Sequence, residues 1–244
     1  LGNMSIIPMF WWWYICLSNH KKIIPHVLFS AALFLVGYIH PYLLLMIVFF
    51  FLSYEGVTII ATRKIPFLKV GFILTPLILF QISIKIFDTI TDRPTRAWGA
   101  KEFACKLHDI LLPLTGFIKE YFLKIIPKIN TGYTEGHGYV SIFGVFVLLV
   151  LVYKFFRALF KKQWKPDLTI GSNSHWLLAA IPVLMFAFFI PFRWNMDWLI
   201  NLISPLKQFR GTGRFIFVFY YVYMVYVFVC MDRLYHKVQR SEER

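Results

Sequence analysis

Residues 215–231 form an apolar, tyrosine-rich run without a charged side chain. Such a run is typical of a transmembrane helix, because about 20 apolar residues in helical form cross the hydrocarbon core of a bilayer. Six further apolar segments precede it, at residues 4–18, 23–40, 41–62, 65–86, 138–156 and 176–192. The sequence therefore predicts an all-α, polytopic integral membrane helix bundle with about seven spans.

The composition excludes an ordinary soluble domain. Hydrophobic residues make up 59% of the chain and charged residues only 16%, and a soluble domain of this size could not bury that much apolar surface. The net charge is +14. Because no nucleic-acid-binding motif accompanies it, we assign this charge to loops that contact anionic lipid. The bilayer is thus an expected partner and nucleic acid is not.

The basic residues predict the orientation of the chain. They fall in four clusters that lie on one side if every segment spans, and the positive-inside rule makes that side cytoplasmic. The clusters are Lys21 and Lys22; Arg63 and Lys64; Arg157, Lys161, Lys162 and Lys165; and Arg233, Lys237, Arg240 and Arg244. The chain then divides into transmembrane helices (1–86), an extracytoplasmic loop (87–137), further transmembrane helices (138–231) and a basic cytoplasmic tail (232–244).

The boundary between the second and third segments falls at His40-Pro41. Proline is accommodated in the first turn of a helix and disfavours helix in the residue before it. We therefore expect a tight outer turn here. A single kinked or re-entrant segment over 23–62 is the alternative.

The extracytoplasmic loop carries two amphipathic patterns, at 100–112 and 114–126. Amphipathic helices of this kind lie in the membrane interface with their apolar faces in the acyl boundary. We expect both stretches to form interfacial helices that act as a lid or platform. Their apolar faces would consist of Phe103, Leu107, Ile110 and Leu111, and of Phe117, Tyr121, Phe122 and Ile125.

Acids and a histidine mark both ends of this loop. Asp92 lies at its start, and Glu135 and His137 lie at its close. These three are candidate catalytic residues, because they could act as acid, base or ligand. The alternative is a solvated glycine turn for Glu135 and His137, and an ion pair or turn cap for Asp92. No metal site is specified, the cofactor is unknown, and a divalent metal stays an open alternative.

Two further polar residues lie in or beside apolar segments. Glu55 lies inside the third segment. Because a charge at membrane depth is costly, we expect it to face the bundle interior, either in a functional role or satisfied by a nearby tyrosine or lysine. His40 at the outer turn could line a cavity or be an ordinary interfacial histidine.

Arg210 and Arg214 are spaced four apart around Gly211 and Gly213, directly before the last apolar run. The predicted topology puts them on the outer side, where arginine is disfavoured. Guanidinium groups bind phosphate oxygens bidentately, and glycines with helix N-terminal amides would assist. The pair is therefore a candidate phosphate-binding site. Anchoring of the last helix at headgroup level is the alternative.

Four motifs resemble segments of polytopic bacterial membrane glycosyltransferases of the GT-C type or their uncharacterised relatives. They are His-Pro-Tyr-Leu-Leu-Leu-Met at 40–46, Asp-Arg-Pro at 92–94, Glu-Gly-His-Gly-Tyr at 135–139 and Phe-Arg-Gly-Thr-Gly-Arg-Phe at 209–215. Such enzymes take sugars from polyprenyl-phosphate carriers, and their catalytic acid usually lies in the first extracytoplasmic loop. No such loop is recognisable here, so we expect this chain to be the C-terminal part of a longer protein.

The resemblance implies sugar transfer from a polyprenyl-phosphate donor to a glycan or lipid acceptor on the extracytoplasmic face of a bacterial inner membrane. It extends a phosphate-binding role to Arg210 and Arg214 and transfers no catalytic residue. A transporter or flippase of a lipid-linked or anionic solute, with Glu55 as coupling residue, is one alternative. A non-catalytic membrane assembly subunit is the other.

Overall fold

A computed structural model describes residues 2–18, 20, 22–89, 103–113, 115–125, 137–160, 173–190, 192 and 211–242. Every regular element in these ranges is helical, which confirms the all-α prediction for the described part of the chain. The helices are α1 (Ile6–Leu17), α2 (Ile23–Ile39), α3 (Pro41–Thr62), α4 (Phe67–Phe87), α5 (Leu107–Leu111), α6 (Phe117–Ile125), α7 (Ser141–Phe160), α8 (Asn173–Ala187) and α10 (Ile216–Glu242), with short 3-10 turns at Gly2–Ser5 (η1) and Thr212–Phe215 (η4).

Three stretches are long and apolar enough to cross a bilayer, among the residues that the structure describes. They are α3, α4 and the continuous helix Thr212–His236. Helices α1, α2, α7 and α8 are apolar, but their qualifying stretches are shorter. This finding is compatible with a membrane protein, and it supports three spans rather than the expected seven.

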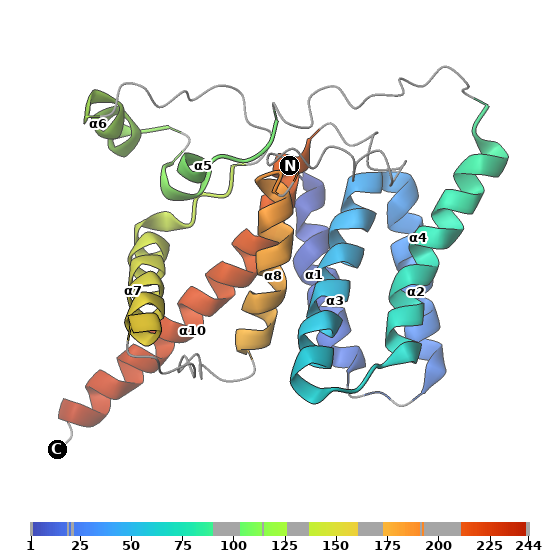
Figure 1. Cartoon of the computed structure of the whole chain (residues 1–244), viewed down its shortest axis with the longest axis horizontal. Helices are drawn as coiled ribbons and strands as arrows, with labels where there is room; N and C mark the ends of the chain where they lie inside the picture. The colour runs from blue at the N-terminus through green and yellow to red at the C-terminus, as the bar shows by residue number, and fades with distance from the viewer. Residues whose placement is uncertain are drawn as a thin grey trace.

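Figure 1 shows α1–α4 grouped on one side and α7, α8 and α10 on the other, with α10 crossing obliquely. Helix α8 joins the two groups because it packs against both α3 and α10. Helix α3 is the centre of the first group and contributes a dense run of buried side chains, from Leu43 to Phe51. The core is therefore continuous across both groups.

The turn between α2 and α3 follows from local chemistry. His40 has extended backbone angles (φ −160°, ψ 104°) and Pro41 opens α3, as expected for a residue before proline and for proline in a first helical turn. The structure thus contains two helices over 23–62. Helix α3 ends at Thr62, and the residue that caps it, Arg63, has a left-handed backbone (φ 55°).

The prediction of an amphipathic helix over 100–112 is wrong in its length. Only Leu107–Leu111 is helical within its described part, and its expected apolar face divides, because Leu107 is 62% exposed whereas Ile110 is 3% exposed. The reason is that the preceding backbone is bonded to the bundle: the Cys105 amide donates to the Ala187 carbonyl (2.8 Å), and the Phe103 carbonyl accepts from Gly213 (3.2 Å). The second stretch does form a helix, α6, with Phe117, Tyr121 and Ile125 exposed.

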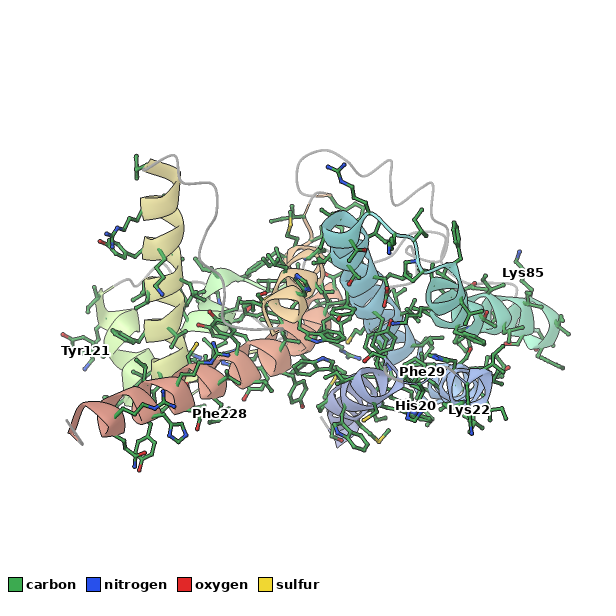
Figure 2. The ribbon with its side chains drawn as sticks, turned by 90° about the horizontal axis from the view of Figure 1, so that it is seen from below. His20, Lys22, Phe29, Lys85, Tyr121 and Phe228 are labelled. Carbon is green, nitrogen blue, oxygen red and sulfur yellow. The ribbon has the colours of Figure 1, made fainter. Side chains whose placement is uncertain are left out.

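The outer surfaces of several helices are apolar. Figure 2 shows Tyr121 and Phe228 projecting from α6 and α10, and Lys85 at the far end of α4. Helix α7 exposes large apolar side chains along its length, among them Ile142, Phe143, Phe146, Leu149, Val152, Phe156 and Phe160. Such a surface is unusual for a soluble protein and suits contact with lipid.

Candidate functional site

Two segments that are far apart in the sequence meet at one end of the bundle. The Gly211 amide before α10 donates to the Tyr42 hydroxyl at the start of α3 (3.1 Å). The Arg214 guanidinium carbon lies 5.3 Å from the centre of the Tyr42 ring, which is within cation–π range. Arg214 Nη1 also lies 3.4 Å from His40 Nε2. We call His40, Tyr42 and Arg214 the arginine cluster.

The protonation of His40 follows from this geometry. Burial lowers the pKa of His40 below its ordinary value, and the neighbouring Arg214 charge lowers it further, so the imidazole is neutral at pH 7. Guanidinium can only donate, so Nε2 accepts and the proton resides on Nδ1. That Nδ1 atom is buried and has no hydrogen-bond partner in the described part of the chain. His40 therefore contacts the guanidinium through Nε2 and carries a buried N–H donor on its other ring nitrogen. A guanidinium and an imidazole N–H are each suitable donors for an oxyanion.

The glycines on either side of Thr212 donate their backbone amides to other parts of the protein. Gly211, Thr212 and Gly213 are buried. The Gly211 amide is bonded to Tyr42 and the Gly213 amide to the Phe103 carbonyl. These donors are engaged by the protein rather than directed at a ligand. These two amides are therefore not available to an anion, which leaves the Arg214 side chain as the main candidate contact.

A second polar cluster lies on α5 and on the segment before α7. Asp109 is 2% exposed, and its Oδ2 accepts the Lys106 amide (2.7 Å). Its Oδ1 lies 3.5 Å from His108 Nε2 and 3.7 Å from His137 Nδ1. We call Asp109, His108 and His137 the carboxylate cluster. It contains one of the predicted candidates, His137.

Asp109 and His108 were not among the residues predicted from the sequence. The available signal was an Asp directly after a His within an otherwise apolar pattern, Leu-His-Asp-Ile-Leu at 107–111. Burial lowers the pKa of His108, with Asp109 acting in the opposite direction. The pairing with His137 depends on a contact between segments that no local pattern encodes.

Both clusters lie at the same end of the bundle. The Val140 amide donates to the Ile110 carbonyl (3.1 Å), which ties the segment carrying His137 to α5. A Cβ atom on Gly138 would lie only 2.9 Å from Ile216 Cγ1, so this backbone is in close contact with the first residue of α10. Arg214 lies two residues before Ile216. The entrance of α10 is thus packed against elements of both clusters.

Glu55 lies toward the other end of α3 and is 2% exposed, which confirms the prediction that it faces the interior. The Tyr14 hydroxyl donates a hydrogen bond to its carboxylate. Aromatic rings surround the pair: Tyr14 stacks on Phe51 (4.3 Å between centroids) and Tyr54 on Trp176 (3.6 Å). Glu55 lies thirteen positions after Tyr42, or about 20 Å along the helix, so Glu55 is not part of the arginine cluster.

Asp92, Glu135 and Arg210 lie outside the described residues. The site therefore rests on His40, Arg214 and His137 from the predicted set, together with Tyr42, Asp109 and His108. In the part of the chain that the structure describes, no group of three His, Cys, Asp or Glu side chains could hold a metal ion.

One protein family, described as "Domain of unknown function (DUF6311)", matches residues 2–241. No curated protein and no solved structure matches the chain. Because the family match extends over nearly all 244 residues, the chain belongs to the DUF6311 family.

Proposed function

We propose that this protein is a membrane glycosyltransferase-like protein that uses a polyprenyl-phosphate sugar donor on the extracytoplasmic face, with a glycan or lipid as acceptor. The observation that carries the proposal is the arginine cluster. Its guanidinium lies over Tyr42 and contacts a neutral His40 whose second nitrogen is buried without a partner among the described residues.

The arginine cluster favours phosphate recognition over membrane anchoring. An anchoring arginine extends to headgroups and makes few fixed contacts with its own protein. Arg214 is instead partly buried, over the Tyr42 ring and beside His40. A guanidinium held in this way loses little side-chain freedom when it binds a phosphate. We assign the phosphate contact to Arg214 and His40, with Arg210 as a further proposed contact.

The apolar surfaces of the helices favour a lipid-linked donor. Exposed large apolar side chains cover α4 and α7, and three helices are long enough to span a bilayer. We propose that the shorter apolar helices α1, α2, α7 and α8 also cross, with local thinning of the bilayer, which gives seven spans. The arginine cluster then faces the extracytoplasmic leaflet of a bacterial inner membrane, where the phosphate of a polyprenyl carrier lies at headgroup depth.

Sugar transfer leaves a phosphate with developing negative charge, and a fixed cation at that position stabilises the transition state. The resemblance of the motifs at 40–46, 135–139 and 209–215 to GT-C enzymes supports this reaction class. A cytoplasmic donor such as a nucleotide sugar would not reach an extracytoplasmic site, which is why a lipid-linked donor is proposed.

The experiment measures the binding of radiolabelled polyprenyl monophosphate to the protein in lipid nanodiscs. Losing a bidentate, charge-assisted contact worth roughly 1.5–3 kcal/mol should weaken binding about tenfold to a hundredfold in Arg214→Ala. Arg214→Lys should retain only part of the wild-type affinity, because lysine lacks the planar guanidinium that binds two phosphate oxygens at once. Unlabelled inorganic phosphate as competitor separates headgroup recognition from recognition of the lipid chain.

Arg157→Ala is the matched control, because Arg157 is an exposed arginine on α7 and its loss changes the net charge equally. It should bind like the wild type. Polyprenol without phosphate serves as a second probe, and its binding should be the same in all variants. If wild type, Arg214→Ala and Arg157→Ala bind polyprenyl phosphate with equal affinity, Arg214 does not bind the phosphate.

A second candidate function is favoured by one observation. Glu55 is a buried carboxylate that accepts a hydrogen bond from Tyr14, and carboxylates at membrane depth serve as proton-coupling groups in transporters. A flippase or transporter of an anionic solute would then use Glu55 as coupling residue. Glu55→Gln should abolish proton-driven uptake in proteoliposomes while leaving polyprenyl phosphate binding unchanged.

A further inference from the structure

The carboxylate cluster presents His137 in a particular way. Its Nδ1 atom lies 3.7 Å from Asp109 Oδ1. Its Nε2 atom is buried and has no hydrogen-bond partner in the described part of the chain. One ring nitrogen is thus next to a fixed carboxylate, and the other is enclosed without a partner. An acid that orients a histidine in this way selects the tautomer with the proton on Nδ1, which leaves the Nε2 lone pair as a proton acceptor.

Asp109 is itself rigidly held. Its second oxygen, Oδ2, accepts the Lys106 amide at 2.7 Å across the first turn of α5, and the carboxylate is 2% exposed. The α5 backbone is bonded to Val140, close to His137, through the Ile110 carbonyl. The backbone of α5 therefore holds Asp109 directly and holds the segment of His137 through Val140. The present distance is longer than a hydrogen bond, and such contacts commonly tighten when substrate binds.

His137 is a better candidate for chemistry than His108. The Nε2 atom of His108 faces Asp109 at 3.5 Å, whereas the Nε2 atom of His137 has no partner among the described residues. The segment of His137 also contacts the entrance of α10 through Gly138 and Ile216. Arg214, the proposed phosphate contact, lies two residues before Ile216 in that same entrance. A donor phosphate at Arg214 would thus lie at the same end of the bundle as His137.

We infer that His137 is a catalytic proton acceptor and Asp109 is its positioning residue, an inference that rests on the proposed sugar transfer. The acceptor hydroxyl gives its proton to His137 Nε2 while its oxygen forms a bond to the anomeric carbon of the sugar. The bond between that carbon and the phosphate oxygen breaks, and its electron pair leaves with the polyprenyl phosphate. His137 becomes an imidazolium stabilised by Asp109 and later releases the proton to solvent.

The first test needs no enzymatic activity. Histidine side chains labelled with ¹⁵N report their tautomer by NMR, and His137→Gln identifies the signal among the seven histidines of the chain. The protein in nanodiscs should show His137 with its proton on Nδ1. Asp109→Asn should move it toward the Nε2-protonated form, because an asparagine amide can donate to Nδ1. A wild-type His137 with its proton on Nε2 would overturn the inference.

The second test measures transfer of radiolabelled glucose from polyprenyl phosphoglucose to octyl glucoside. His137→Gln should lower kcat about a hundredfold to ten-thousandfold, which is the range for loss of a general base, with KM for the donor little changed. His175→Gln is the matched control, because His175 is exposed on α8, and it should retain full activity. Asp109→Asn should lower kcat, and Asp109→Glu should recover part of it.

The outcomes separate this inference from the proposed function. Normal kcat in His137→Gln, with wild-type transfer measurable, removes the role of His137 and leaves sugar transfer standing. A second outcome is that the wild type shows no sugar transfer while His137 carries its proton on Nδ1 in a way that depends on Asp109. That result would reject transfer between this donor and acceptor, and it would support the Asp109–His137 contact. A His137 with its proton on Nε2 would reject the positioning of His137 by Asp109, whether or not sugar transfer is observed.

Discussion

The guanidinium of Arg214 and the imidazole of His40 lie 3.4 Å apart, from Nη1 to Nε2. One residue follows α2 and the other precedes α10, so the contact joins the two halves of the chain. Tyr42 completes it, because its ring lies under the guanidinium and its hydroxyl accepts the Gly211 amide.

This contact predicts a change in the pKa of His40. Burial is the largest cause of its lowered pKa and the Arg214 charge is the second. Arg214→Gln removes the charge, so the pKa of His40 should rise toward its ordinary value of about 6.5. NMR titration of the ¹⁵N-labelled histidines measures this shift. Arg157→Gln, a distant control, should leave it unchanged, and an unchanged pKa in Arg214→Gln would contradict the contact.

The same shift predicts how stability depends on pH. Because the pKa of His40 is lower in the folded protein, the unfolded chain binds more protons in the interval between the two values. The free energy of unfolding should therefore decrease as pH falls from about 6.5 through the folded pKa. Thermal unfolding in detergent across this interval should show a weaker dependence for His40→Gln than for wild type. Identical pH profiles would refute the prediction.

Replacement by alanine should lower the stability of the protein at Gly37 and Gly138 and raise it at Gly56. A Cβ on Gly37 would lie 2.8 Å from both Leu44 and Phe80 side chains, and one on Gly138 would lie 2.9 Å from Ile216. Both substitutions should lower the free energy of unfolding by about 1–3 kcal/mol through overpacking. Gly56 has open space at this position, so Gly56→Ala should raise stability by up to about 1 kcal/mol through helix propensity. Thermal unfolding ranks the three variants.

The Tyr14–Glu55 hydrogen bond predicts a non-additive pair. Tyr14→Phe leaves the buried carboxylate without that donor and should cost about 1–3 kcal/mol. Tyr14→Phe combined with Glu55→Leu removes the carboxylate as well, so the double variant should be more stable than the sum of the single losses indicates. A double-mutant cycle by thermal unfolding measures the coupling, and strict additivity would argue against it.

The proposed orientation predicts which loops an impermeant thiol reagent reaches in intact cells. Thr115, between α5 and α6, and Lys64, between α3 and α4, are both exposed. In a variant without Cys16, Cys105 and Cys230, a cysteine at Thr115 should be labelled. A cysteine at Lys64 should be labelled only after the membrane is permeabilised. The reverse pattern would invert the topology and move the arginine cluster to the cytoplasmic side.

Helix positions were largely predictable because apolar runs and proline act locally. The expected segments 41–62 and 65–86 correspond closely to α3 and α4, and the turn at His40 follows from Pro41. The burial of Glu55 was predictable from the cost of a charge among apolar residues. Length was less predictable: the apolar segment expected at 138–156 has an apolar helical stretch of only Ser141–Lys154.

The candidate site was only partly predictable. Arg214 and His40 were each identified, but their contact depends on how α8 brings α3 and α10 together. Asp109 was missed because it is buried where distant segments meet: Phe103 is bonded to Gly213 in η4, and Cys105 is bonded to Ala187 at the end of α8. These bonds also explain why the predicted helix over 100–112 is short. No periodicity in the sequence encodes such pairings.

The position of α8 between α3 and α10 has a consequence for how the protein could be assembled. The chain continues from α4 to α5 through residues 88–106, whereas packing between the two halves passes mainly through α8. Two separately expressed fragments, 1–95 and 96–244, should therefore reassociate in the membrane without a peptide link. His40 and Arg214 would then belong to different polypeptides. Recovery of polyprenyl phosphate binding on co-expression would show that the two fragments had associated.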